Sequence, residues 1–251
     1  MIKRYVAIIV CCFCLLCSGC IVSKDDLTSN VNFLQKENDE LKQEYDKFKN
    51  VSVLYDFYNQ LTLETVHSLV LVESKNIGTL NTQYSEGVVV YSNGYNFYIL
   101  TDYSKLLHSY GVKYRVMDAS ANVYDAALIY DGNNIMYDVQ TGMVLLRVQL
   151  SRNTANMKEI SLGNRSDTMA VMSNLGQLNK IQLINNNYIN SEEYIDYDEE
   201  IYKSFCINQI NYGSIINDNG DLAGLYLNNL QAFADASLIK KVAYATYSLV
   251  L

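Results

Sequence analysis

The sequence reads Gly87-Val88-Val89-Val90, passes through the turn dipeptide Asn93-Gly94 and continues as Tyr98-Ile99-Leu100-Thr101. β-Branched and aromatic residues favour strands, and Asn-Gly favours a tight turn between antiparallel strands. This stretch therefore predicts a β-hairpin. Short apolar or alternating runs of the same kind recur at 66–72, 87–91, 97–101, 112–117, 126–130, 143–149, 169–173, 181–184, 205–207 and 222–227. So many short strands predict an all-β barrel or sandwich.

The end of the chain has a different periodicity. Apolar residues there recur at the spacing of one face of an α-helix, and two lysines lie between them. These apolar residues are Leu238, Val242, Ala245 and Leu249. The sequence therefore predicts an all-β domain over residues 63–251 that closes with a C-terminal helix.

The order of these segments resembles the trypsin-like peptidase domain of the HtrA branch of the chymotrypsin fold. In that family a glycine-valine strand leads into the motif "ILTN", as Gly87-Val88-Val89-Val90 here leads into Tyr98-Ile99-Leu100-Thr101. Further landmarks follow in the family's order: Tyr124-Asp125-Ala126-Ala127-Leu128, Val144-Leu145-Leu146-Arg147-Val148, Ile160-Ser161-Leu162-Gly163, Asn217-Asp218-Asn219-Gly220-Asp221-Leu222-Ala223-Gly224 and Ala232-Phe233-Ala234-Asp235. The resemblance implies a chymotrypsin-like double β-barrel.

The same resemblance identifies the positions of the family's catalytic triad. The histidine corresponds to Ser104, the aspartate to Gly142 and the nucleophilic serine to Asn211. A serine hydroxyl is not a base at neutral pH, glycine cannot orient an imidazolium, and a carboxamide is a poor nucleophile. Where the family has a glycine two residues before the nucleophile, this chain has Gln209. Of the family's glycines immediately around that loop, this chain keeps Gly213. The resemblance therefore implies a pseudoenzyme without catalytic residues or a cofactor.

Neighbouring residues offer an alternative in which the chemistry has moved. Ser214 follows Asn211 by three positions, and His108 follows Ser104 by four, so a helical turn would bring His108 to the same face. A triad requires its members within hydrogen-bond reach of one another. We therefore expect Ser214 to be a turn hydroxyl and His108 to be a surface or half-buried ring.

The sequence predicts no metal site. Its two histidines and its cysteines do not have zinc-ligand spacing, and we expect His67 to lie on the solvent side of the first strand. Cys206 is the one cysteine after Cys20, and we expect it to be a buried apolar thiol. The acidic stretch 191–200 lacks the glycine and alternating ligands of a calcium loop, which favours a solvated loop.

The first 19 residues have the pattern of a signal peptide. Lys3 and Arg4 precede an apolar run at 5–16 that is too short to span a bilayer. The run ends in Leu16-Cys17-Ser18-Gly19-Cys20, which resembles the bacterial lipobox although that motif usually has leucine where Cys17 stands. The resemblance implies lipidation of Cys20 and a membrane anchor on the extracytoplasmic face. A secreted protein and an uncleaved anchor are the alternatives.

Residues 20–62 predict a helical stalk. A heptad pattern runs through Leu27, Val31, Leu34, Asn38, Leu41, Tyr45 and Phe48. The residues between these positions are mostly charged or carry amides, as in a coiled coil. Asn38 falls on an a position, where a buried amide favours a parallel pair, so we expect a homodimer through 27–48. A single amphipathic helix folded against its own domain is the alternative.

The net charge of −8, with no basic stripe, argues against a nucleic-acid partner. The sequence therefore predicts a lipid-anchored, trypsin-like pseudoprotease that binds or scaffolds an extended peptide or protein ligand outside the cell membrane. The alternatives are an active serine hydrolase with a rearranged site and a surface adhesin.

Overall fold

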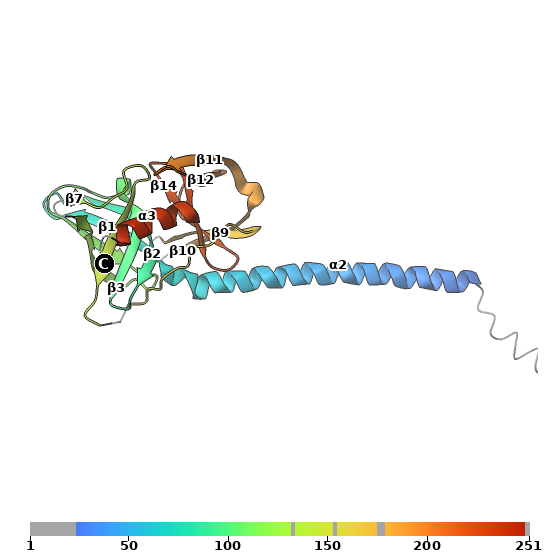
Figure 1. Cartoon of the computed structure of the whole chain (residues 1–251). Coiled ribbons are helices and arrows are strands. Elements are labelled where there is room, and N and C mark those ends of the chain that lie inside the picture. The colour runs from blue at the N-terminus through green and yellow to red at the C-terminus, as the bar shows by residue number, and fades with distance from the viewer. Residues whose placement is uncertain (1–23, 132–133, 153–154, 175–178, 249–251) are drawn as a thin grey trace, which may run out of the picture. The chain divides into compact units, whose positions relative to one another are not determined.

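The computed structural model describes residues 24–131, 134–152, 155–174 and 179–248 (Figure 1). The chain divides into two compact units, Met1–Tyr55 and Asp56–Leu251. The predicted signal peptide at 1–19 and the predicted lipidation site Cys20 lie outside the described residues. No helix in the described part of the chain is both long and apolar enough to cross a bilayer.

The helix α2 (Lys24–Leu63) is 40 residues long and includes the segment predicted as a stalk. Its residues in the first unit are exposed wherever their side chains are described. Its last two turns belong to the second unit, where Phe57 and Leu61 are buried in the core. The helix therefore has a solvent-exposed part and a part that is packed into the domain.

The first half of the domain is a closed antiparallel barrel with the strand order β1-β2-β3-β8-β5-β4. Its strands are β1 (Leu69–Asn76), β2 (Thr82–Ser92), β3 (Asn96–Asp102), β4 (Val112–Met117), β5 (Val123–Leu128) and β8 (Met143–Gln149). Between β5 and β8 the short strands β6 (Tyr130–Asp131) and β7 (Asn134–Ile135) pair with each other. The barrel interior is filled by alternating residues such as Val70, Val72 and Ile99, as the period of two along a strand requires.

The second half is a seven-stranded antiparallel sheet with the order β10-β9-β13-β14-β15-β12-β11. Its strands are β9 (Thr168–Asn174), β10 (Asn179–Asn185), β11 (Ile189–Tyr197), β12 (Glu200–Ile207), β13 (Ser214–Asn217), β14 (Leu222–Leu227) and β15 (Ala232–Asp235). Strands β10 and β11 lie at its two ends. The helix α3 (Ala236–Ser248) follows β15, and Leu238, Ile239 and Val242 pack into the largest core cluster.

The prediction of a mostly β domain with a barrel and a C-terminal helix is confirmed. Leu249, the last residue of the predicted helical face, lies outside the described residues. The prediction for 66–72 is wrong in its first half, because the 3-10 helix η1 (Thr65–Ser68) precedes β1. One apolar run therefore serves two elements.

The prediction for the acidic stretch is also wrong. Residues 191–197 lie in β11, and Asp198 and Glu199 form the turn to β12, both with positive φ. Two successive residues of that conformation form the tight turn that matches the twist of a hairpin. The stretch is therefore a β-hairpin and not a loop.

Candidate functional site

Ser104, at the family's histidine position, is an exposed residue of the 3-10 helix η2 (Tyr103–Lys105) directly after β3. Its backbone N and its Oγ both donate to Asp102 Oδ1, at 2.9 and 2.7 Å. Asp102 is buried, and its other oxygen accepts a hydrogen bond from the backbone N of Asn228 at 2.7 Å. Asp102 thus caps η2 and connects the barrel to the segment that follows β14.

Gly142, at the family's aspartate position, lies close to η2 because β3 and β8 pair with Asp102 opposite Met143. The Gly142 carbonyl accepts a hydrogen bond from the Tyr103 backbone N at 2.8 Å. Its φ is +78°, and a Cβ built there would lie 2.8 Å from Nδ2 of Asn229. The Asn229 side chain therefore occupies the space that a side chain at position 142 would need.

Asn211, at the family's serine position, is exposed and follows a turn closed by a hydrogen bond from Ile210 N to Ile207 O. Gln209 is the third residue of this turn and has a φ of +61°, which glycine adopts at lower cost. Gly213 has a φ of +85°, and a Cβ there would lie 2.6 Å from the Met172 carbonyl oxygen. The retained glycine is therefore required by close packing against β9.

Contacts between the barrel and the sheet surround these positions. The Lys105 ammonium lies 5.4 Å from the centre of the Tyr226 ring, and Tyr226 N donates to Gly213 O. Glu86 of β2 accepts a hydrogen bond from the Ser173 hydroxyl of β9. Burial raises the pKa of Glu86, although the Ser173 hydrogen bond and the Lys105 charge oppose this effect. The junction is thus polar and holds a partly desolvated carboxyl.

A cavity of about 280 Å³ opens beside Asn211. It is lined by Cys206, Ile207, Gln209, Ile210, Asn211, Tyr226, Gln231, Ala232 and Phe233. Gln231, like Gln209, has a positive φ, and its side-chain amide donates to the Asn228 carbonyl at 2.6 Å. Two residues in a sparsely populated backbone conformation therefore border the same cavity, as is common at ligand sites. Because its lining carries no formal charge, the cavity suits an uncharged side chain.

The relocated triad finds no support in the geometry. The prediction that Ser214 is a turn residue is wrong. Ser214 is buried in β13, which pairs with β9 on one side and with β14 on the other. His108 is exposed, as predicted, and its ring stacks on Tyr103 with the centroids 3.9 Å apart. Tyr103 also stacks on Tyr137, at 4.3 Å. Desolvation by this packing lowers the pKa of His108, which therefore belongs to an aromatic stack beside η2.

No protein-family model and no curated protein matches this chain. The positions that carry the resemblance to trypsin-like peptidases come together only in part: Ser104 and Gly142 flank the Tyr103 amide, while Asn211 lies with Gly213 on the sheet side of the junction.

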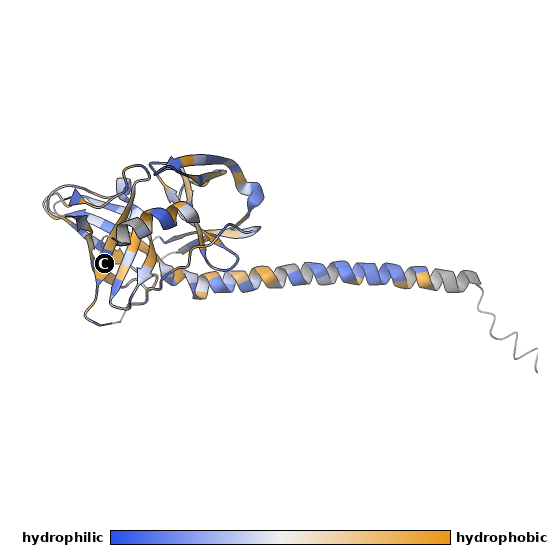
Figure 2. Cartoon of the chain, viewed as in Figure 1, coloured by the Kyte–Doolittle hydropathy of each residue, from blue (hydrophilic) through white to orange (hydrophobic). Residues whose placement is uncertain are grey.

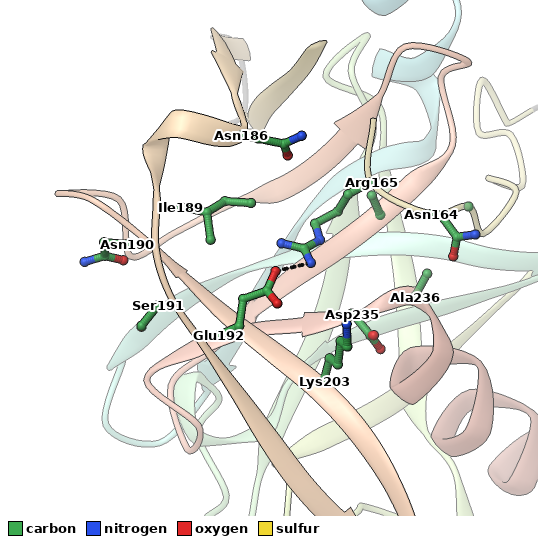
Figure 3. Close-up of a pocket in the computed structure, with 12 residues that line it drawn as sticks. Asn164, Arg165, Asn186, Ile189, Asn190, Ser191, Glu192, Lys203, Asp235 and Ala236 are labelled. Atoms are coloured by element: carbon green, nitrogen blue, oxygen red, sulfur yellow. Dashed lines mark hydrogen bonds and ion pairs between the residues drawn. The ribbon is translucent and has the colours of Figure 1, made fainter. Parts of the chain in front are cut away.

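A second, larger cavity of about 630 Å³ lies between β11, β12 and the start of α3. Figure 3 shows the Arg165 guanidinium and the Glu192 carboxylate pointing toward each other across it, and the two form an ion pair. Hydrogen bonding from Arg165 lowers the pKa of Glu192. Lys203 and Asp235 also line this cavity. Its positive and negative groups balance, so it favours neither an anionic nor a cationic ligand.

Several carboxylates of the acidic hairpin formed by β11 and β12 form ion pairs. Besides the Glu192 pair with Arg165, Asp198 and Glu200 lie 3.2 and 3.4 Å from the Lys241 ammonium of α3. In the described ranges no group of three or more histidine, cysteine or acidic residues could hold a metal ion. His67 lies in η1 and not in the predicted strand, and its buried Nδ1 has no hydrogen-bond partner in the structure.

Sequence reasoning missed Asp102 and Asp138, whose carboxylates accept hydrogen bonds at the site, and Asn229, whose side chain fills the space beside Gly142. Asp138 Oδ1 accepts from the Thr141 backbone N at 2.6 Å, and its other oxygen accepts from the Tyr197 hydroxyl at 2.7 Å. Burial and this hydrogen bond raise the pKa of Tyr197. An aspartate directly after the apolar run 97–101 was a signal for Asp102, since aspartate commonly caps helices. Asn229 had no such signal.

Proposed function

We propose that the second unit is a trypsin-like domain that has lost its catalytic triad and acts as an extracytoplasmic binding module. The chain's own barrel, its C-terminal helix and the order of its segments support the finer assignment to a chymotrypsin-like double barrel. Lipidation of Cys20 would anchor the module to the membrane. The proposal combines these elements into a lipid-anchored pseudoprotease.

The observation that carries the proposal is the structure around position 142. A family aspartate would need a side chain where the backbone has a φ of +78° and where Asn229 fills the space. Ser104, at the histidine position, donates its hydroxyl to Asp102. Ser104 cannot take a proton from a nucleophile, and position 142 has no room for a carboxylate that would orient a base, so the surroundings support loss of the triad more strongly than the residue types alone.

The proposed ligand is an extended peptide that inserts an uncharged side chain into the cavity beside Asn211. Proteases of the family that the chain resembles hold substrates by strand pairing, which does not need the triad. Gln231 lines the cavity and donates its side-chain amide to the carbonyl of the exposed residue Asn228 at 2.6 Å, so Asn228 contacts the lining. The uncharged lining of the cavity is what supports an uncharged side chain in this ligand.

A peptide array tests this proposal. The mature chain, added to immobilised decapeptides of varied sequence, should bind a subset rich in uncharged side chains. Asn211→Trp should reduce this binding at least about tenfold, because the indole would fill the cavity. Asn164→Trp, in the cavity of Figure 3, is the matched control and should bind normally.

Each result has a clear meaning. Loss of binding in Asn211→Trp alone supports the proposed site. Binding that is lost in Asn164→Trp and kept in Asn211→Trp would assign the ligand to the other cavity. An array with no bound peptide would contradict the peptide ligand altogether.

A further inference from the structure

A row of exposed apolar side chains follows α2 in the first unit. Val31, Leu34, Leu41 and Tyr45 are 50, 61, 61 and 66% exposed. Figure 2 shows α2 as a mostly hydrophilic helix with apolar residues at intervals. Covering exposed apolar side chains of this size with a partner removes them from water, which lowers the free energy of the system.

The spacing of these residues specifies the shape of the partner. With Leu34 and Leu41 as d positions, Val31 and Tyr45 fall on a positions, and so does Asn38 between them. A seam with steps of three and four fits the same seam of another helix. The ion pair between Lys36 and Glu40, at 3.7 Å, lies at the f and c positions on the outer face. The face that carries the a and d positions is therefore the one available for association.

The charges beside the seam specify direction and register. Glu37 occupies a g position and Lys42 the e position of the next heptad. In a parallel, in-register pair, a g residue lies beside the e residue five positions later in the other helix, so each Glu37 would meet the other copy's Lys42. The sequence repeats this order one heptad later with Glu44 and Lys49. An antiparallel pair would instead bring glutamate to glutamate and lysine to lysine, which is unfavourable.

We infer that the partner of this face is α2 of a second copy, in a parallel and in-register two-stranded coiled coil with Asn38 beside Asn38. The charge order and the seam support the same arrangement independently. Asparagine at one a position favours two strands in a single register, because any other register buries the amide against apolar side chains. The inference concerns the helix alone and does not depend on the function proposed for the second unit.

Disulfide cross-linking of the full chain in bacterial membranes tests this inference. In a Cys206→Ser background, Leu34→Cys should be oxidised to a disulfide-linked dimer by copper phenanthroline within minutes. Lys36→Cys, on the outer face, is the matched control and should give at least about tenfold less dimer. The parent without an added cysteine measures the background from Cys20.

A mixed experiment separates parallel from antiparallel pairing. When differently tagged Leu34→Cys (d position) and Tyr45→Cys (a position) chains are expressed together, like chains should cross-link and mixed pairs should be rare, because only an antiparallel pair brings d positions against a positions. Dominant mixed pairs would indicate an antiparallel arrangement and would overturn the inference. Equal cross-linking of Leu34→Cys and Lys36→Cys would overturn it as well, because it would show random collision.

A charge reversal provides a second readout that does not involve the seam. Glu37→Lys should lower the cross-linking rate of Leu34→Cys about threefold, and Lys42→Glu in the same chain should restore it. Glu40→Lys makes the same change in charge at an outer c position and should have no effect. An unchanged or faster rate in Glu37→Lys would contradict the parallel register.

Discussion

The buried carboxylate of Asp102 accepts a hydrogen bond from the backbone N of Asn228, with 2.7 Å between Oδ2 and N. The other oxygen of the same carboxylate holds the backbone and hydroxyl of Ser104. One side chain therefore links the end of β3 to the segment after β14. Since that segment borders the proposed peptide site, the contact joins the fold of the barrel to the geometry of the cavity.

Removing this carboxylate should destabilise the domain. Asp102→Ala leaves the Asn228 and Ser104 donors without their acceptor, so we expect the free energy of unfolding to fall by about 2–3 kcal/mol. Asp125→Ala, at an exposed position on β5, is the control and should change it by less than about 0.5 kcal/mol. Urea unfolding followed by circular dichroism gives both values. Equal losses in the two variants would refute the linking role of Asp102.

A comparison of glycines separates backbone strain from crowding at position 142. Gly142 and Gly111 have φ values of +78° and +80°, but only Gly142 has a side chain within 4 Å of a built Cβ. We expect Gly111→Ala to cost about 1 kcal/mol and Gly142→Ala about 2 kcal/mol of unfolding free energy. Adding Asn229→Ala to Gly142→Ala should bring the cost to the Gly111→Ala level. If it does not, Asn229 is not the obstruction, and an aspartate there would be easier to restore than we expect.

The half-buried carboxyl of Glu86 should make stability depend on pH. Its folded pKa is raised by burial, so the folded state gains relative stability below the ordinary value of 4.5 and loses it as the pH rises through the folded pKa. Glu86→Gln should therefore be more stable than the unaltered chain at pH 7, and the difference should shrink as the pH falls through the raised folded pKa and be lost below the ordinary value of 4.5. Glu193→Gln, on the exposed strand β11, should show no such difference.

Thermal unfolding at several pH values measures this effect. A difference between Glu86→Gln and the unaltered chain that is constant across pH would show that the carboxyl does not titrate with folding. A variant that is less stable at pH 7 would show that the Lys105 and Ser173 contacts outweigh burial.

The proposed lipid anchor has its own test. The apolar run at 5–16 and the small residues before Cys20 predict that cells fed labelled palmitate will label the chain. Cys20→Ala should lose the label and leave the detergent phase, while Cys206→Ala should keep both. A Cys20→Ala chain that is still labelled and still partitions with detergent would contradict the lipoprotein assignment.

Strands rich in aliphatic residues were predictable from sequence, and others were not. The runs at 112–117, 143–149 and 222–227 match β4, β8 and β14 residue for residue, because each carries enough valine, leucine or isoleucine to stand out. Strands β13 and β15 were missed, since four residues are too few for a periodic signal. Strand β11 was missed because an edge strand that faces solvent can be acidic and still pair with its neighbour.

The site was less predictable than the fold for a physical reason. Residue types at positions 104, 142 and 211 were readable, and they suggested a missing triad. The hydrogen bond from Asn228 to Asp102 and the obstruction of Gly142 by Asn229 join segments more than 80 residues apart, so no local pattern contains them. In the sequence, His67 lies in what looks like one apolar run with Val66 and Leu69, which predicts a strand. In the structure Val66 belongs to η1 and Leu69 to β1, so the run is divided between two elements.

The central claim is that the domain has lost its catalytic triad, and labelling with a fluorophosphonate tests it most directly. The unaltered mature chain, incubated with a fluorescent fluorophosphonate beside active trypsin, should remain unlabelled and should not hydrolyse casein or peptide esters above background. Stoichiometric labelling that abolishes a measurable hydrolysis, with the adduct mapped to Ser214 or to any other serine, would contradict the claim and would show a relocated active site.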